Sequence, residues 1–240
     1  MARTSLKEPA GGTPAFAGFG PQALGFLKAL AFHQDKAWFE ENRGIYDDEL
    51  KAPLVGLIGD LCGRFEALDL PLRGDRRSIF RLHRDIRFSK DKRPYKTNAG
   101  AVLSRDGTKR SQGFLYIHID PEGCFAAAGF WHPEPDDLLA LRRAIIGKPK
   151  GFRDAVAKLD KAGLVLGDGD PVARVPKGFE DVAEPDLAAA IRMRNVIVRR
   201  PVDADAIRSP ALVEDLVRFA RAAEPLLRFG WAALEAHRPA

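Results

Sequence analysis

The sequence predicts a single α+β domain with a mainly antiparallel sheet packed by N- and C-terminal helices. Apolar residues recur at helical spacing near both ends of the chain, whereas they alternate with a period of two in the central part. No internal repeat or change in composition divides the 240 residues, and one large domain accounts for that length. Helices that flank a block of strands favour an α+β arrangement.

The N-terminal part predicts a tail followed by three helices. Residues 1–20 are rich in Ala, Gly and Pro without periodicity, so we expect a flexible tail there, dispensable through residue 18, and the single domain over 21–240. Helices are expected over 22–32, over about 36–51 behind an Asp35 N-cap, and from Pro53 to about Leu68.

The central part predicts the sheet. Residues 78–88 place Phe80, Leu82, Ile86 and Phe88 on one face of an expected strand, and we expect these four side chains to be buried against helices. A second strand is expected over 99–103. Alternation over 114–120, a turn at 121–123 and a return over 124–130 predict a hairpin.

The C-terminal part returns mostly to helices. We expect helices over 136–146, 152–162 and 185–193, and a strand over 196–198. Ser209 is expected to cap a helix that runs to about Ala223, and Pro225 is expected to start a separate last helix.

Several classes of protein are excluded by what the sequence lacks. No stretch approaches 18 apolar residues, so no membrane partner is expected, and the first residues have no apolar region typical of a signal peptide. Cys62 and Cys124 have no metal-ligand spacing, which predicts two free thiols in a reducing cytoplasm. Because dinucleotide, P-loop, zinc and hydrolase motifs are also absent, we expect no cofactor and no metal.

Positive charge is concentrated in one segment. Residues 73–110 hold 13 lysines and arginines against four acids, a net charge of +9, whereas the rest of the chain holds 25 against 29, a net charge of −4. The protein is therefore a mildly acidic body with one basic segment, and this segment is the place to expect an anionic partner.

A specific motif lies in the basic segment. It reads R-x-x-R-D-x-R-F-x-x-D-K-x-x-Y, with its fixed positions at Arg81, Arg84, Asp85, Arg87, Phe88, Asp91, Lys92 and Tyr95. On these residues the chain resembles the uncharacterised, mainly bacterial domain-of-unknown-function family 2461. Similar segments at 38–46, 129–133 and 174–179 extend the resemblance over about residues 22–235. The resemblance implies no activity, so function has to be argued from the residues.

The basic motif has two interpretations. In the first, cations converge on a phosphate or carboxylate group, because an arginine guanidinium presents a planar fork of donors. The residues expected to bind the anion are Arg81, Arg84, Arg87, Lys92 and Lys96, and those expected to carry catalysis are Asp85, as base or as orienter of an arginine, and Tyr95. In the second, the same residues form an internal ion-pair network.

Arg84 is the residue on which the two interpretations depend. It falls on the apolar face of the expected strand, where an unpaired guanidinium is costly. Either a bulge near His83 brings Arg84 to the polar side, or Arg84 is a buried cation paired with a carboxylate elsewhere.

Two classes of function remain open. The favoured class is binding of a phosphate- or carboxylate-bearing small molecule in an arginine-rich pocket, with or without catalysis. The alternative is a nucleic-acid-associated protein that contacts phosphates through residues 73–110 and stacks bases on Tyr95, Tyr116 or Trp131. His83 and His118 are weaker acid–base candidates, and the sequence does not indicate an oligomeric state.

Overall fold

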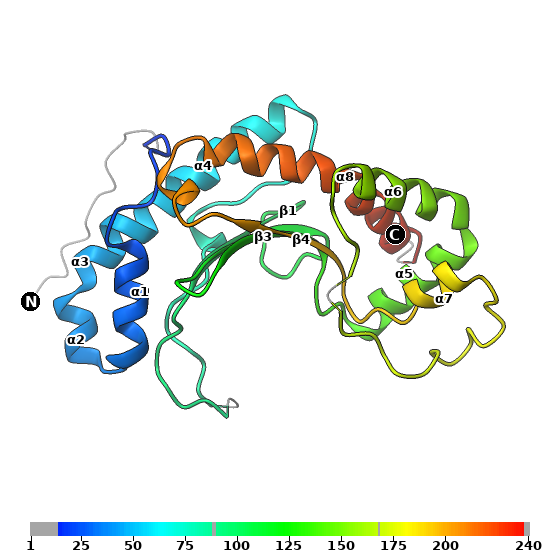
Figure 1. The fold of residues 1–240 in the computed structure, drawn as a ribbon, viewed down its shortest axis with the longest axis horizontal. Coiled ribbons are helices and arrows are strands. Elements are labelled where there is room, and N and C mark those ends of the chain that lie inside the picture. Colours follow the sequence, from blue (N-terminus) through cyan, green and yellow to red (C-terminus); the bar gives the residue numbers. More distant parts are fainter. Residues whose placement is uncertain (1–13, 88–89, 168, 238–240) are drawn as a thin grey trace, which may run out of the picture.

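The computed structural model describes residues 14–87, 90–167 and 169–237. Its centre is an antiparallel sheet with the strand order β1-β2-β3-β4. The strands are β1 Ala99–Ser104, β2 Phe114–Ile119, β3 Cys124–Phe130 and β4 Val196–Val202. Helices cover one face of the sheet and lie at both of its ends (Figure 1). The α+β class and the antiparallel sheet are thereby confirmed, as is the hairpin over β2 and β3.

The helices that precede the sheet begin close to the predicted positions. They are α1 Ala23–Phe32, α2 Lys36–Glu41, α3 Arg43–Tyr46, a π-helical turn Asp47–Lys51 and α4 Ala52–Ala67. Asp35 caps α2 by accepting a hydrogen bond from the Trp38 amide at 2.9 Å. The single helix expected over 36–51 is instead divided at Asn42, whose side-chain amide donates to the Trp38 carbonyl at 2.9 Å. Such a local side-chain bond competes with regular helical bonding.

The helices that follow the hairpin include one difference from prediction. They are α5 Pro135–Gly147, α6 Pro149–Lys161, α7 Pro185–Ala190 and α8 Leu212–His237. The separate helix expected from Pro225 does not exist, because α8 continues through that residue. Proline removes one backbone donor, but Ala223, Leu226 and Leu227 around it are all buried, and this packing holds the helix together.

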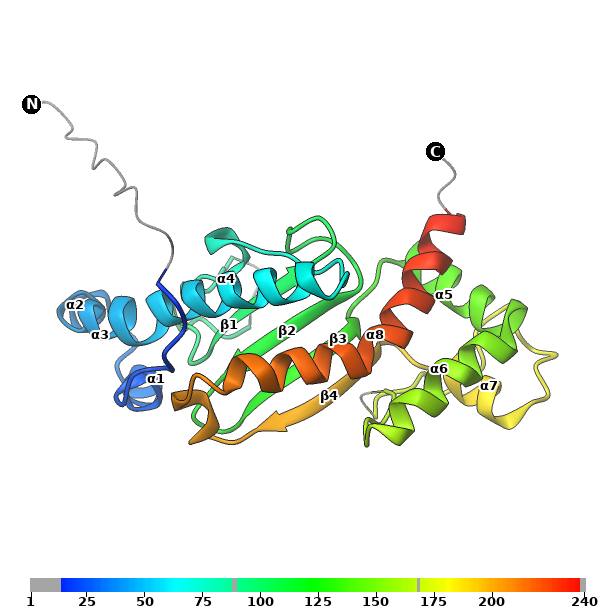
Figure 2. The same cartoon turned by 90° about the horizontal axis from the view of Figure 1, so that it is seen from above.

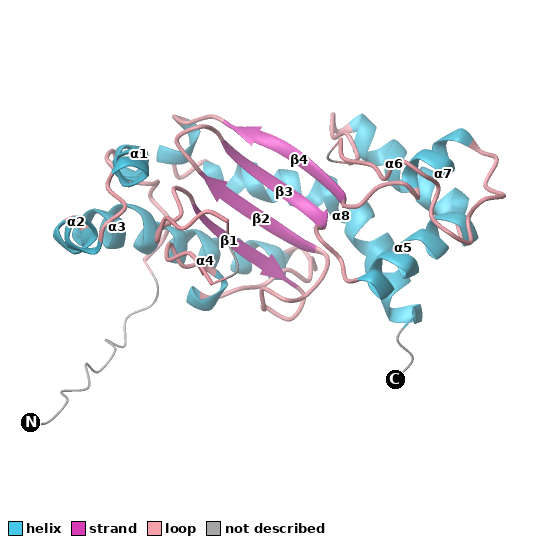
Figure 3. Ribbon diagram, turned by 90° about the horizontal axis from the view of Figure 1, so that it is seen from below, coloured by secondary structure: helices cyan, strands magenta, loops and turns pink. Residues whose placement is uncertain are grey.

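The two longest helices form the layer on one face of the sheet. Figure 2 shows α4 and α8 crossing over the strands, α4 on β1 and α8 on β3. Leu115, Ile117 and Ile119 alternate along β2 and are buried under this layer. The opposite face, seen in Figure 3, has no described helix lying over it. The side chains between the three leucine and isoleucine positions therefore point to an open surface.

The strand expected over 78–88 is not formed over its described residues, 78–87. Two single-residue bridges remain, Ile79 with Ala101 and His83 with Tyr95. After Leu82 the chain turns away from its neighbour β1 and forms a loop. The Lys96 amide closes this loop by donating to the Leu82 carbonyl at 2.7 Å.

The burial expected for that strand is correct at only one of the three described positions. Leu82 is buried, Phe80 is half-buried, and Ile86 is 40% exposed. The fourth position, Phe88, lies outside the described residues.

The expected N-terminal tail differs from the structure over its last residues. Residues 1–13 lie outside the described part, but Phe16 and Phe19 are both buried in the main core. The Phe16 amide donates to the Asp60 carboxylate at 2.8 Å, and the Phe19 amide donates to the Ile207 carbonyl at 3.0 Å. Residues 14–20 are therefore part of the packed structure.

Candidate functional site

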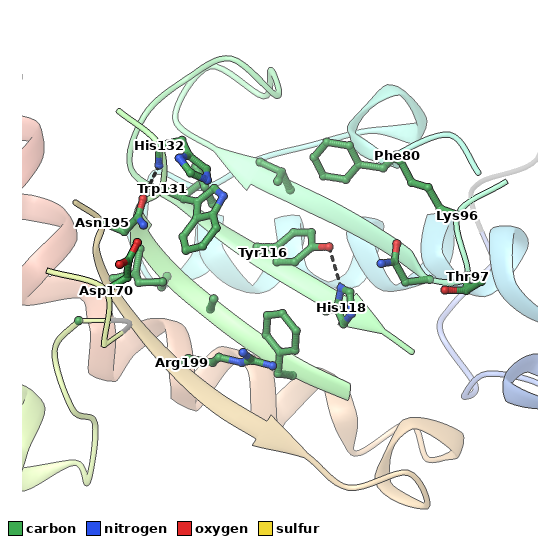
Figure 4. Close-up of a pocket in the computed structure, with 18 of the residues that line it drawn as sticks. Phe80, Lys96, Thr97, Tyr116, His118, Trp131, His132, Asp170, Asn195 and Arg199 are labelled. Atoms are coloured by element: carbon green, nitrogen blue, oxygen red, sulfur yellow. Dashed lines mark hydrogen bonds between the residues drawn. The ribbon is translucent and has the colours of Figure 1, made fainter. Parts of the chain in front are cut away.

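A cleft of about 1130 Å³ lies on the open face of the sheet (Figure 4). This volume suits a molecule of cofactor size. The residues that line it are Phe80, Arg84, Lys96, Thr97, Asn98, Val102, Phe114, Tyr116, His118, Phe125, Ala127, Ala128, Trp131, His132, Gly167, Asp170, Asn195, Ile197 and Arg199.

The floor of the cleft is built by the register of the sheet. Val102, Tyr116, Ala127 and Arg199 are successive partners across the four strands. Because side chains alternate along a strand, these four point to the same face. Residues far apart in the sequence therefore meet in one row, with small Ala127 leaving a depression between the larger side chains.

One wall of the cleft is formed by the residues that come directly after β3 in the chain. Trp131 is 43% exposed although it is a large apolar side chain. The next residue, His132, has a φ of 45°, a backbone conformation that is uncommon without glycine. Its amide donates to the side-chain oxygen of buried Asn195 at 2.7 Å. This bond fixes the turn that presents Trp131 to the cleft.

The opposite wall comes from the basic segment, in which the acids are locally engaged. Three aspartates each form a fork with the arginine two residues later: Asp75 with Arg77, Asp85 with Arg87, and Asp91 with Arg93. The fourth acid, Asp106, accepts a hydrogen bond from the Thr108 amide at 2.8 Å. The charge of these acids is therefore largely committed to near neighbours in the chain.

Two lysines of the basic segment, Lys96 and Lys109, lie beside Phe80. The Lys96 and Lys109 ammonium groups lie 5.5 Å and 5.3 Å from the centre of its ring, within the range of a cation–π interaction. The pKa of Lys96 is lowered, first by burial and then by the charges of Arg84, Lys109 and Arg81. Within the described part of the chain, no carboxylate lies at ion-pair distance from either lysine. This end of the cleft therefore carries a surplus of positive charge.

Arg84 has features of both interpretations of the motif, because it lies near a carboxylate and also lines the cleft. Its side chain is 26% exposed, and its terminal nitrogen lies 3.4 Å from the Asp91 carboxylate. Its Nε atom is buried and has no hydrogen-bond partner among the described residues. A buried donor without a partner is costly, and here it belongs to a residue that lines the cleft.

A chain of polar side chains crosses the floor of the cleft. The Tyr116 hydroxyl lies 2.8 Å from His118 Nδ1, and His118 Nε2 lies 3.4 Å from the Asp120 carboxylate. Figure 4 shows the Tyr116–His118 bond in the middle of the site. Burial raises the pKa of Tyr116 to about 12, so the phenol is protonated at neutral pH.

Aromatic stacking holds the histidine of this chain. The His118 ring stacks on Phe125 with a centroid separation of 4.4 Å, and the Arg199 guanidinium lies 3.5 Å from the Phe125 ring centre. Burial lowers the pKa of His118, Asp120 opposes this effect, and Arg199 adds to it. A neutral imidazole is therefore favoured at neutral pH.

The structure places the sequence-predicted site residues in three locations. Arg84 and Lys96 line the cleft, and the charge of Arg81 acts on Lys96. Three others lie exposed on the loop beyond the cleft: Asp85, Arg87 and Lys92. There Arg87 lowers the pKa of Asp85 to about 2, which makes this carboxylate a weak base.

Tyr95 is placed in the core, away from the cleft. It is 2% exposed and stacks on Phe39 with a centroid separation of 4.7 Å. His83 contacts the same two rings and is not among the residues that line the cleft. Of these two acid–base candidates, His83 and His118, only His118 lines the cleft.

Sequence reasoning missed the cleft residues that come from β3 and β4. Phe125 and Arg199 have no motif around them, and the strand register brings them to the site. A usable signal existed at Tyr116 and His118, because they occupy the polar positions of a cleanly alternating strand.

Comparisons with known proteins give a family but no activity. No described helix is both long and apolar enough to span a membrane. No curated protein and no solved structure matches the chain. A family model described as a conserved hypothetical protein, DUF2461, matches residues 22–229. Since the match extends over most of the sequence, the chain belongs to the DUF2461 family.

Proposed function

We propose that this protein binds a small molecule that carries a phosphate or carboxylate group together with a flat ring, and that it does so in the cleft on the open sheet face. The observation that carries the proposal is the group of cations around Phe80. All four acids of residues 73–110 have close partners, whereas Lys96 and Lys109 have no described carboxylate at ion-pair distance. An anionic group at this end would offset their mutual repulsion.

The anion would sit against Arg84 and Lys96. The Arg84 side chain is 26% exposed, so its guanidinium can donate to a bound oxygen, and charge-assisted bonds of this type are the strong ones. The lowered pKa of Lys96 reflects burial and neighbouring cations, both of which an anion would counteract. Arg81 and Lys109 would add to the field without being required to touch the ligand.

The ring would lie between Tyr116 and Trp131. Trp131 is held at the far wall by the His132–Asn195 bond, and stacking against a fixed, partly exposed indole costs little conformational entropy. Asp170 lies at that same wall, so a polar group there rather than a second anion is favoured. The proposed ligand is thus anionic at one end only.

The remaining sequence-predicted residues take a lesser part in this proposal. Arg87 and Lys92 would attract an anion from the rim of the cleft, and Asp85 would orient Arg87 through the fork between them. Tyr95 would support the wall through its packing on Phe39.

Thermal unfolding and calorimetry with phenyl phosphate test the proposal, with inorganic phosphate and phenol as the two fragments. Phenyl phosphate is expected to raise the Tm more than either fragment. Lys96→Gln is expected to weaken its binding about tenfold or more, because a charge-assisted hydrogen bond contributes about 1.5–3 kcal/mol. The matched control is Lys158→Gln, since Lys158 is exposed on α6, outside the cleft. Equal binding by both variants, or none by the parent, would refute the proposal.

A second candidate is binding of single-stranded nucleic acid. It is favoured by the open four-stranded sheet, on which Tyr116 and Phe125 are both partly exposed, because aromatic side chains on such a face can stack bases. A fluorescent oligouridine titrated at rising salt distinguishes the two. Binding that falls steeply and linearly with the logarithm of salt concentration would favour nucleic acid.

A further inference from the structure

We propose that Tyr116, His118 and Asp120 form a proton relay that makes the cleft a site of acid–base catalysis, with Tyr116 as the group that exchanges a proton with the bound molecule. The inference rests on the proposed ligand site, because Tyr116 and His118 line the same cleft (Figure 4). It goes beyond that proposal by assigning a chemical step to groups that binding alone does not require.

The order of the three groups sets the direction of the hydrogen bonds. An ionised carboxylate only accepts hydrogen bonds, so Asp120, at 3.4 Å from His118 Nε2, favours a proton on that nitrogen. The other ring nitrogen, Nδ1, then accepts from the Tyr116 hydroxyl at 2.8 Å. A neutral histidine oriented in this way by a carboxylate can act as a base, and it leaves the lone pairs of the tyrosine oxygen free for the ligand.

The relay is held in place by packing. The side chains of His118 and Asp120 are only 13% and 17% exposed, and the stack on Phe125 fixes the plane of the imidazole. Gly100 leaves room for the tyrosine, since a Cβ atom there would lie 2.9 Å from the Tyr116 hydroxyl oxygen. A constellation whose rotamers are locked by its surroundings is suited to catalysis.

The chemical step is a coupled transfer of two protons. The bound molecule gives a proton from an O–H, N–H or activated C–H bond to the Tyr116 oxygen, while the Tyr116 proton moves to His118 Nδ1. The electron pair of the broken bond stays on the bound molecule, and His118 becomes an imidazolium beside Asp120. The reverse path returns the proton to a different atom of the same molecule. The reaction class is therefore proton transfer within one anionic substrate, which consumes no oxidant or second reactant.

Coupling the two transfers avoids a free tyrosinate. Burial raises the pKa of Tyr116 to about 12, so loss of its proton without simultaneous gain would be slow at neutral pH. The charged and titratable groups facing the histidine are Tyr116 and Asp120 on or beside β2 and Arg199 on β4. Asp120 stabilises the imidazolium and Arg199 disfavours it, and together with burial they leave His118 neutral and ready to accept.

Covalent labelling of the tyrosines tests the relay without knowledge of the substrate. The probes are 4-(fluorosulfonyl)benzoate, which is an anion, and neutral benzenesulfonyl fluoride. On reaction, an O–S bond forms at Tyr116, the S–F bond breaks, fluoride leaves with the electron pair, and the phenolic proton passes to His118. Peptide mapping then compares Tyr116 with Tyr46 and Tyr95, the other two of the three tyrosines in the chain.

We expect selective labelling of Tyr116 that depends on its partners. His118→Phe keeps a ring beside Phe125 but removes the base, and it should slow labelling about tenfold or more. Asp120→Asn should slow it less. In the parent, the rate should rise with pH through a midpoint below 6.5, the ordinary pKa of imidazole, because only neutral His118 accepts the proton. Nitrogen-15 NMR of the parent should show His118 protonated on Nε2.

The outcomes separate this proposal from the binding proposal. Labelling that is unaffected by His118→Phe, labelling that shows no midpoint below 6.5, or a His118 protonated on Nδ1 would overturn the relay. Labelling that depends on His118 but is no faster with the anionic probe than with the neutral one would support the relay and refute the anion site. If His118→Phe does not fold, the pH profile and the NMR tautomer of the parent still decide the matter.

Discussion

Gly100 on β1 faces Tyr116 on β2 so closely that a Cβ atom on the glycine would lie 2.9 Å from the tyrosine hydroxyl oxygen and 2.8 Å from the Ile117 carbonyl oxygen. Gly100→Ala should therefore lower the free energy of unfolding by about 1–3 kcal/mol and displace the phenol from His118. Urea denaturation measures the first effect, and the nitrogen-15 shift of His118 Nδ1 measures the second. An alanine variant with parental stability and an unchanged His118 signal would contradict this account.

The pKa of His118 should move in opposite directions when its two charged neighbours are removed. Asp120 raises this pKa and Arg199 lowers it. Asp120→Asn should therefore lower the pKa of His118 further, and Arg199→Gln should raise it toward the ordinary value. Titration of the His118 ring signals by NMR checks both. Shifts of the same sign in the two variants would show that the field at His118 has another origin.

The depressed pKa of His118 also predicts a loss of stability in acid. The unfolded chain takes up a proton at this residue near the ordinary imidazole pKa of 6.5, before the folded protein does. This contribution to stability is present above that pH and is lost as the pH falls through the folded pKa. His118→Phe should flatten the pH dependence of the urea midpoint in this window. A parental slope in the variant would assign the acid sensitivity to other groups.

Residues 14–20 should contribute to stability as core. Phe16 and Phe19 are 4% and 3% exposed and their rings lie 5.5 Å apart. Phe16→Ala and Phe19→Ala should each lower the free energy of unfolding by about 3–5 kcal/mol. Phe32→Ala is the control, because this side chain is 80% exposed, and its effect should stay within about 0.5 kcal/mol. Parental stability of the first two variants would restore the interpretation of this segment as a dispensable tail.

Gly230 marks a close approach of α8 to Phe130 on β3. A Cβ atom there would lie 2.2 Å from the Phe130 ring, so Gly230→Ala should destabilise the protein by about 1–3 kcal/mol despite the higher helix propensity of alanine. Gly63→Ala in α4 is the matched control, since nothing lies within 4 Å of its would-be Cβ atom. That variant should be stabilised by up to about 1 kcal/mol. Equal effects at the two positions would contradict the tight contact.

The elements that could be predicted from the sequence are those whose local pattern and tertiary surroundings agree. The hairpin at Leu115 and Ile117 alternates because one side faces α4 and α8, and the structure keeps that pattern. The same alternation failed at Ile86, because the chain folds back on itself after Leu82 and leaves Ile86 exposed. At Pro225 the missing backbone donor of proline predicted a new helix, but the packing of buried neighbouring residues keeps α8 continuous.

The residues of the candidate site also fall into those that could be predicted from the sequence and those that could not. Arg84 and Lys96 could be identified because their charge is visible in the sequence as a local excess. Phe125 and Arg199 could not, since they reach the cleft only through pairing of β3 with β4. The charged loop at Arg87 attracted attention for its arginines, and Asp85, expected to orient one of them, engages the Arg87 guanidinium in a fork.

The two walls of the cleft differ in how they are attached. Helix α8 packs on α4 and β3 and continues onto α5 and α6, so the sheet and the C-terminal helices beside the Trp131 wall share one continuous support. The opposite wall, described over residues 79–87 and 90–98, forms a single bridge to β1 between Ile79 and Ala101, whereas the His83–Tyr95 bridge lies within the wall itself. Amide hydrogens of the C-terminal side should accordingly exchange with solvent only in large cooperative openings, whereas those of the basic wall exchange through small local ones. Binding of an anion should therefore slow amide exchange in the basic wall alone. Slower exchange of these amides would show that the cleft is occupied, while exchange in the rest of the molecule stays unchanged.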